Sequence, residues 1–326
     1  MGTVHDIIEA RGKQAAIQSD FDRAVVEAAA VYMADEGSGL GFLYSGWCQA
    51  ALPHRRLPDD MTWQIDSERV TLAVEPGRKP DSKNRGQLVP VGVPFGSRAR
   101  LIMLYLQTEA MRSNSRDIML GRSLRDWLGK MGISNGGKSQ SDVREQAERI
   151  ARCRFTFHVN TGGRLGLVNQ NVVDTAMFMP STDPAQGTLF TEVARLSEGF
   201  FEQLRKHPVP VEEAGIRALS NNSVALDIYA WLAYRLHVLS KPTPVSWGAL
   251  KGQFGPGVSR MNNFKPTFTA GLRLALAVYR HAKVDMDERG LILHPSSPPV
   301  APKVFAVAGR VHGQGRVLSM PTPSKN

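Results

Sequence analysis

The chain of 326 residues has only two cysteines, Cys48 and Cys153, and they lie far apart. Isolated thiols offer neither a disulfide framework nor the spacing of a zinc knuckle, so both are expected to be buried and reduced. No segment approaches the roughly 18 consecutive apolar residues of a membrane span, and the first residues lack the apolar run of a signal peptide. These absences predict a cytoplasmic protein with no membrane partner.

The sequence is also poor in arrangements that are typical of enzymes. Its eight histidines are dispersed, and no pair of them has the spacing of metal ligands. No G-x-S-x-G nucleophile elbow is present. We therefore expect no catalytic residue, no metal, no cofactor and a function that is not enzymatic.

The chain has an excess of positive charge, and the excess is unevenly distributed. The formal net charge is +10. By segment it is −3 over residues 1–96, +7 over 97–165, −3 over 166–240 and +9 over 241–326. Two basic blocks separated by acidic stretches indicate two surfaces that bind a polyanion.

The first basic block has the element order of a winged helix. Apolar spacing and turn residues predict a helix over 97–112, a short strand at 116–120, and helices at 123–132 and 139–152 joined by a glycine turn. The β-prone segments 153–160 and 164–179 follow, and they are expected to form the wing hairpin.

The same order is expected to recur in the second basic block. Helices are predicted over 221–240 and from about 263 to 282, with a short strand and helix at 244–255 between them. A hairpin over Arg289 and Gly290 closes the block. No direct sequence repeat links the two blocks, so their similarity rests on element order alone.

The segment 132–139, GISNGGKS, satisfies the phosphate-loop pattern G-x-x-x-x-G-K-[ST]. A phosphate loop must follow a buried strand, but the residues before this one are predicted to be helical. We therefore interpret the glycines as the turn of a helix-turn-helix, with Lys138 and Ser139 meeting a DNA phosphate at the helix N-terminus. An ATPase that uses this loop is the third hypothesis for the protein's function.

The helix after this turn is the candidate reader of base edges in the first block. Its polar face carries Gln140, Ser141 and Arg144, and glutamine and arginine suit adenine and guanine edges in the major groove. Phosphate contacts are expected from the preceding helix and from the wing, through Arg122, Arg125, Arg154 and Arg164. The alternative interpretation is an ordinary solvated face.

The matching helix of the second block has a similar polar set. Its candidate DNA-binding residues, with one on the preceding helix and one at the wing tip, are Lys251, Arg260, Asn262, Asn263, Lys265, Thr267, Arg273 and Arg289. The alternative here is a basic surface without sequence preference.

Three long runs resemble the core of RepA-type plasmid replication initiators. They are residues 92–158, 196–247 and 262–279, beginning GVPFGSRARL, LSEGFFEQLR and NNFKPTFTAG. The resemblance covers roughly residues 40–297. It implies two winged-helix domains that bind repeated sequences (iterons) at a plasmid origin, open the duplex there, and recruit the host replication initiator and replicative helicase. It also implies dimers that repress the protein's own gene, and it assigns no individual base contact.

The expected fold is therefore α+β, with two tandem winged-helix domains that each consist of a helix-turn-helix and a β-hairpin wing. Residues 1–39 form an N-terminal extension with one helix, 40–182 the first domain, 183–297 the second, and 298–326 a flexible basic tail. The expected function is plasmid replication initiation and copy control by a protein associated with the nucleoid or plasmid. A winged-helix transcriptional repressor is the alternative. The iteron sequence and the oligomeric form, monomer or homodimer, stay open.

Overall fold

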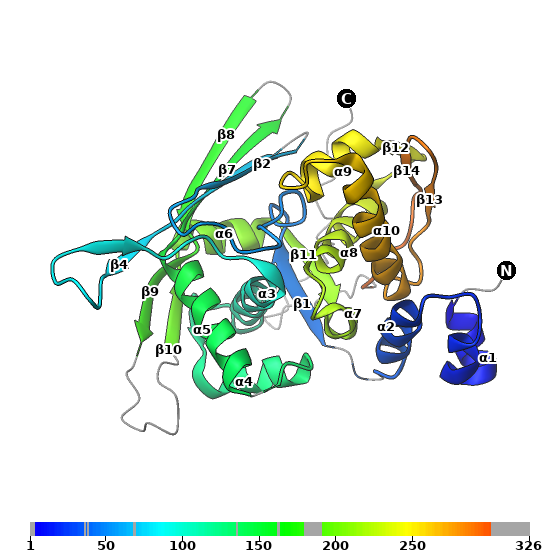
Figure 1. The fold of residues 1–326 in the computed structure, drawn as a ribbon, viewed down its shortest axis with the longest axis horizontal. Helices are drawn as coiled ribbons and strands as arrows, with labels where there is room; N and C mark the ends of the chain where they lie inside the picture. Colours follow the sequence, from blue (N-terminus) through cyan, green and yellow to red (C-terminus); the bar gives the residue numbers. More distant parts are fainter. Residues whose placement is uncertain are drawn as a thin grey trace, which may run out of the picture.

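The structure, a computed structural model, describes residues 4–35, 37, 39–67, 70–134, 136–161, 164–178 and 191–300. Most of the predicted tail therefore lies outside the described residues. Among the described helices, none is both long enough and apolar enough to cross a membrane. Figure 1 shows an elongated molecule in which helices lie between small sheets.

The N-terminal extension contains two helices, where the sequence predicted one. These are α1 (Val4–Ile17) and α2 (Arg23–Met33). α2 has the expected apolar face and begins at Asp22, whose side chain accepts a hydrogen bond from Ala24 N. α1 is interrupted at Gly12, which has non-helical backbone angles, so its local signal is weak. It is held by packing on α2 and by His5, whose ring lies 2.8 Å from the carbonyl oxygen of Ala277.

The first unit consists of four consecutive elements, three helices and a strand, and of a pair of strands that follows later in the chain. Its elements are α3 (Gly96–Ser113), β6 (Asp117–Met119), α4 (Gly121–Lys130), α5 (Gly137–Arg152), β9 (Val173–Phe178) and β10 (Thr191–Leu196). The three strands form an antiparallel sheet in the order β6-β10-β9. The helix α3 packs between this unit and the rest of the molecule through a buried face that includes Leu101, Leu104 and Tyr105.

The second unit repeats this order. Its elements are α8 (Ser223–Arg235), β12 (Thr243–Ser246), α9 (Trp247–Phe254), α10 (Met261–Ala277), β13 (Val284–Met286) and β14 (Gly290–Leu293). Its strands are ordered β12-β14-β13, so in both units the strand between the helices pairs with the last strand. The expected duplication therefore extends from element order to sheet order.

The hairpin predicted as the first wing belongs to a different sheet. β7 (Arg154–Thr161) and β8 (Arg164–Asn171) pair with each other, and β7 also pairs with β3 (Val70–Glu75), which pairs with β2 (Trp63–Asp66). The predicted second strand, 164–179, is divided between β8 and β9. The predicted hairpin therefore forms between β7 and β8, but it belongs to the sheet of β2 and β3 and not to the sheet that contains β6.

The strand β10 lies beyond the predicted domain boundary at residues 182 and 183, yet it pairs with β6 and β9 of the first unit. The segment 179–190, which joins β9 to β10, lies outside the described residues. The sequence could not show this pairing, since it depends on contacts across a long connection.

Further elements connect the two units. The strand β1 (Leu40–Tyr44) pairs with β11 (Pro208–Glu212), and α6 (Glu198–Lys206) and α7 (Glu213–Leu219) flank the latter in sequence. Ser197 caps α6, accepting a hydrogen bond from Phe200 N. β4 (Arg78–Pro80) and β5 (Leu88–Pro90) form a short antiparallel hairpin.

The fold is therefore α+β with small antiparallel sheets. Buried apolar side chains from both units form one continuous core. Cys48 and Cys153 are free and buried in it, as predicted. Burial raises the pKa of the Cys153 thiol to about 11, which keeps it protonated near neutral pH.

Candidate nucleic-acid interface

Two helices meet at a tight turn in the first unit. α4 ends at Lys130 and is followed by Gly132, whose positive φ of 75° suits glycine, and Ile133 N bonds back to Leu128 O. α5 then begins at Gly137, and Gln140 N bonds to Gly136 O at 3.0 Å. The hydroxyls of Ser134 and Ser139 lie 3.1 Å apart across the turn. This arrangement presents the free amide groups at the start of α5, where an anion such as a phosphate binds favourably.

The same geometry bears on the phosphate-loop motif. The element before the turn is α4, a helix, whereas a nucleotide-binding loop follows a buried strand. Lys138 is exposed at the first turn of α5. The local structure is therefore that of a helix–turn–helix corner.

The candidate residues of the first unit lie on both helices of this corner. On α4, Arg125 is exposed and Arg122 has 92% of its side chain exposed, 3.6 Å from Asp126. On α5, Lys138 and Ser141 are exposed, whereas those that are partly exposed are Ser139, Gln140 and Arg144. The structure thus brings these seven residues to one corner of the molecule.

The C-terminal half of α5 is tied into the body of the protein. Glu145 pairs with Arg56 and Arg149, each at 2.8 Å. Glu148 pairs with Lys79 at 2.7 Å, and Arg149 is buried, with its guanidinium donating to Val93 O. The two glutamates are therefore engaged in ion pairs, and the fully exposed polar side chains of α5 lie on its first turns.

Arg154 and Arg164 lie on β7 and β8, which belong to the sheet of β2 and β3 and not to the sheet of β6 beside this corner. Arg154 is exposed at the start of β7, opposite Glu75 of β3 and Asn171 of β8. Arg164 begins β8, and its side chain lies outside the described residues. Neither residue is on a strand that pairs with β6, and their role as phosphate contacts stays a prediction.

A second corner is formed by α9 and α10. Ser246 caps α9, accepting a hydrogen bond from Ala249 N, and a turn through Gly255 and Val258 leads to α10. Of the candidates here, Lys251 and Lys265 are partly exposed, and those fully exposed are Arg260, Asn262, Asn263, Thr267 and Arg273. Lys265 Nζ lies 5.0 Å from the centre of the Trp247 ring, and this contact holds its ammonium group beside the corner.

The turn between β13 and β14 presents Arg289 to solvent. The Asp287 carboxylate accepts hydrogen bonds from Arg289 N at 2.8 Å and Gly290 N at 2.9 Å, which fixes the turn. Next to it, an open groove of about 740 Å³ runs between α2, α10 and this hairpin. Its charged lining residues are Asp22, Lys265, Arg273, Asp287 and Glu288.

The acidic side of this groove was not predicted. Asp22 is more than 240 positions before Lys265 in the chain, so only the docking of the N-terminal helices places its carboxylate there. The groove thus combines three carboxylates with two cations at one edge of α10. The basic surface of the second unit lies on the first turns of α10.

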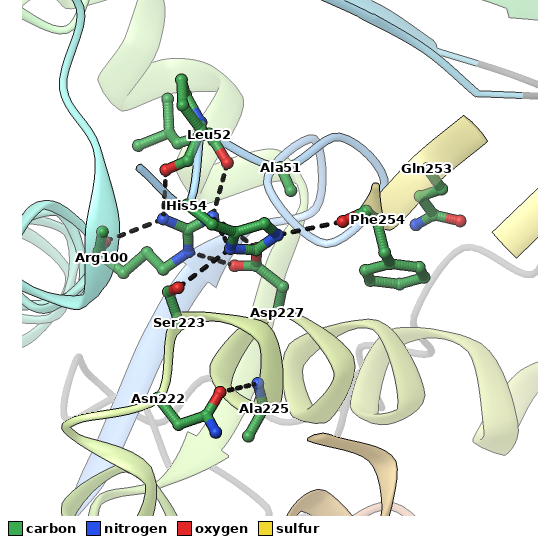
Figure 2. Close-up of polar contacts among 12 residues, drawn as sticks. Ala51, Leu52, His54, Arg100, Asn222, Ser223, Ala225, Asp227, Gln253 and Phe254 are labelled. Atoms are coloured by element: carbon green, nitrogen blue, oxygen red, sulfur yellow. Dashed lines mark hydrogen bonds and ion pairs between the residues drawn. The ribbon is translucent and has the colours of Figure 1, made fainter. Parts of the chain in front are cut away.

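A buried polar network joins the two units (Figure 2). Arg100 of α3 donates from Nε and Nη2 to the two carboxylate oxygens of Asp227 on α8, each at 2.6 Å. The same guanidinium donates to the carbonyl oxygens of Leu52, Pro53 and Gly96. Only 9% of the Arg100 side chain and 11% of that of Asp227 are exposed. Because α3 belongs to the first unit and α8 to the second, this network fixes one unit against the other.

His54 completes the network. Its Nδ1 lies 3.0 Å from the Ser223 hydroxyl and its Nε2 lies 3.1 Å from Phe254 O, so the imidazole bridges α8 and α9. Burial, with the adjacent Arg100 cation, lowers the pKa of His54 to about 4, against the pull of Asp227. The ring is therefore neutral at physiological pH.

Residues 93–247 match the family model described as plasmid encoded RepA protein. The matched segment starts just before α3 and ends at the beginning of α9, so it includes the first unit and the start of the second. This segment is similar to the RepA family. The resemblance expected from the sequence is thereby confirmed, and the RepA-type segment holds both residues of the Arg100–Asp227 pair.

Solved structures similar to this chain include domains 2 and 3 of RctB. A crystal structure of selenomethionine derivatives of these domains is 12% identical to the chain with a TM-score of 0.50, covering 77% of the chain and 95% of the other. A second crystal structure of RctB domains 2–3 is 11% identical with a TM-score of 0.45, covering 76% and 93%. The first likeness shows a shared fold that extends past the RepA-type segment. No protein with a curated description matches the sequence.

Proposed function

We propose that this protein initiates plasmid replication by binding repeated sequences at the origin through two winged-helix units. The RepA-family match over residues 93–247 carries the proposal. The repeated sheet order supports the winged-helix assignment, with β9–β10 as the wing of the first unit and β13–β14 as that of the second. In each unit the helix after the turn, α5 or α10, is the reading helix.

The charge distribution supports duplex DNA as the ligand. In both units the exposed cations and amides gather on the first turns of the reading helix and on the helix before it. Arginine, glutamine and asparagine there suit base edges, while Lys138, Arg122 and Arg260 suit phosphates. Affinity should come mainly from the phosphate contacts, so binding should weaken steeply with added salt.

The fixed spacing of the two units supports the proposed role at the origin. The Arg100–Asp227 network holds both reading helices in one body, so one protein covers two segments of a repeat. Binding to adjacent iterons distorts the flanking duplex, and the host initiator and replicative helicase are then recruited. In this scheme the protein is not an enzyme, and it represses its own gene by binding the same sequence at the promoter.

A plasmid-establishment assay combined with footprinting tests the proposal. DNA flanking the gene is introduced into a host that lacks the protein, and the protein is supplied in trans. Protection of tandem repeats together with replication of that DNA supports the initiator. Protection of an operator without replication would overturn the initiator role and favour a winged-helix repressor, while no protection would overturn sequence-specific binding.

A further inference from the structure

The hairpin of β4 and β5 is a defined structure that lies beside α5. Arg78, Lys79 and Pro80 pair with Pro90, Val89 and Leu88 in that order. Its turn is organised by Asp81, whose carboxylate accepts from Lys83 N at 2.9 Å and from Asn84 Nδ2 at 2.8 Å. Gly86 closes the turn with a φ of 84°. These bonds hold the turn residues in one conformation before any ligand arrives.

The base of the hairpin is anchored to the end of α5. Lys79 pairs with Glu148, and Arg152 Nη1 donates to Arg78 O at 3.2 Å. Gly77 lies so close to the carbonyl of Arg152 that a Cβ at this position would overlap it. The hairpin therefore keeps a fixed position relative to the reading helix, and Figure 1 shows it projecting from the body on the side of α5.

The charges at the tip are available to a ligand. The hairpin carries four cations and one carboxylate, and that carboxylate, Asp81, is occupied within the turn. Lys79 already forms an ion pair with Glu148. Lys83 and Arg85 are exposed, and within the described part of the chain neither has an ion-pair partner. A preformed turn with two unpaired cations loses little conformational entropy when it meets phosphates.

The distance along α5 suits a duplex that is already seated on its first turns. At about 1.5 Å of rise per residue, Arg152 lies about 20 Å along the axis from Lys138. That is less than the roughly 34 Å of one turn of B-DNA. A duplex read by the first turns of α5 is therefore long enough to extend past the end of α5 at which the hairpin is anchored.

We propose that the β4–β5 hairpin is an additional DNA contact, in which Lys83 and Arg85 hold backbone phosphates beside the segment read by α5. The inference rests on the proposed DNA binding and adds a contact that carries no sequence information. Its contribution is affinity and register, because phosphate contacts position a protein and base contacts specify the sequence.

The test compares two double variants of the full chain on a mixed-sequence duplex at several salt concentrations. For Lys83→Ala with Arg85→Ala we expect binding roughly tenfold weaker near 0.1 M salt, and a log–log salt slope smaller by about 1.8. The charge-matched control, Arg11→Ala with Lys13→Ala, alters exposed cations of α1 at the opposite end of the molecule. The control should retain the wild-type slope, and Lys83→Arg with Arg85→Lys should do so too.

The possible outcomes separate the inference from the function on which it rests. If the wild-type protein does not bind duplex DNA, the proposed function fails. If the wild-type binds and the hairpin variant keeps its affinity and slope, the hairpin contact is wrong. An equal fall in slope for the hairpin and α1 variants would also overturn it, since net charge alone would then account for the effect.

Discussion

The side chains of Arg100 and Asp227 form a bidentate ion pair that is buried between the two units, with both N–O distances at 2.6 Å. Removing one partner leaves the other charge buried without compensation. We expect Asp227→Ala to lower the free energy of unfolding by about 3–5 kcal/mol, measured by urea denaturation of the full chain. The double variant Arg100→Met with Asp227→Leu should recover much of this loss, because no buried charge remains.

An exposed ion pair is the control for this prediction. Arg23 and Glu27 lie 2.9 Å apart on the surface of α2. Arg23→Ala should change the free energy of unfolding by about 0–1 kcal/mol. If Asp227→Ala lowered the free energy of unfolding by no more than this control, the network would not be what holds the two units together.

His54 makes stability depend on pH. Its pKa is about 4 in the folded protein, because it is buried beside Arg100, and near its ordinary 6.5 in the unfolded chain. As the pH falls from about 6.5 to about 4, the unfolded state takes up a proton that the folded state does not. The free energy of unfolding should fall over this window by up to about 3 kcal/mol and be unaffected by His54 at higher pH.

The variant His54→Gln separates this effect from other titrations. Denaturation midpoints measured between pH 4 and pH 7 should show a weaker dependence on pH in the variant than in the wild-type protein. His158→Gln is the matched control, because His158 is exposed on β7. An equal pH dependence in all three proteins would contradict the role of His54.

Elements with strong local signals were predictable from the sequence. The apolar positions of α8, among them Leu226, Tyr229 and Ala233, recur at helical spacing, and Ser197 precedes α6 as a cap. Both candidate corners were placed correctly for the same reason, since glycine turns and the polar first turns of α5 and α10 are local patterns.

Contacts between distant segments were not predictable. The Gly-Gly sequence between β7 and β8 is the strongest hairpin signal near α5, so the sequence favoured that hairpin as the wing. In the structure β6 pairs with β10, which follows it more than 70 positions later in the chain. The helical pattern predicts a solvated side chain at Glu148. In the structure, Lys79 of the β4–β5 hairpin forms an ion pair with it. Arg100 and Asp227 are 127 positions apart, and nothing local marks them as partners.

Lys138 separates DNA binding from nucleotide hydrolysis. The lysine is exposed at the first turn of α5, after a helix, and should contact one phosphate of the duplex. Lys138→Ala should weaken binding by a similar factor on all sequences and reduce the log–log salt slope by about 0.9, measured by fluorescence anisotropy. Lys13→Ala on α1 should leave the slope unchanged. An ATPase activity that Lys138→Ala abolishes, with DNA affinity unchanged, would support the phosphate-loop hypothesis.

Arg144 and Asn263 test whether both units read bases. Arg144 lies on α5 and Asn263 is exposed on α10, so each alanine variant should lose contacts in a different part of the repeat. A lost bidentate base contact costs about 1–3 kcal/mol, or roughly 5- to 150-fold in affinity, and relaxes the preference at one base pair. Missing-base interference on the protected DNA should map the two losses to separate positions, with Lys13→Ala matching the wild-type pattern. Footprints left unchanged by both substitutions would refute reading by two units, and a loss for one alone would assign recognition to that unit.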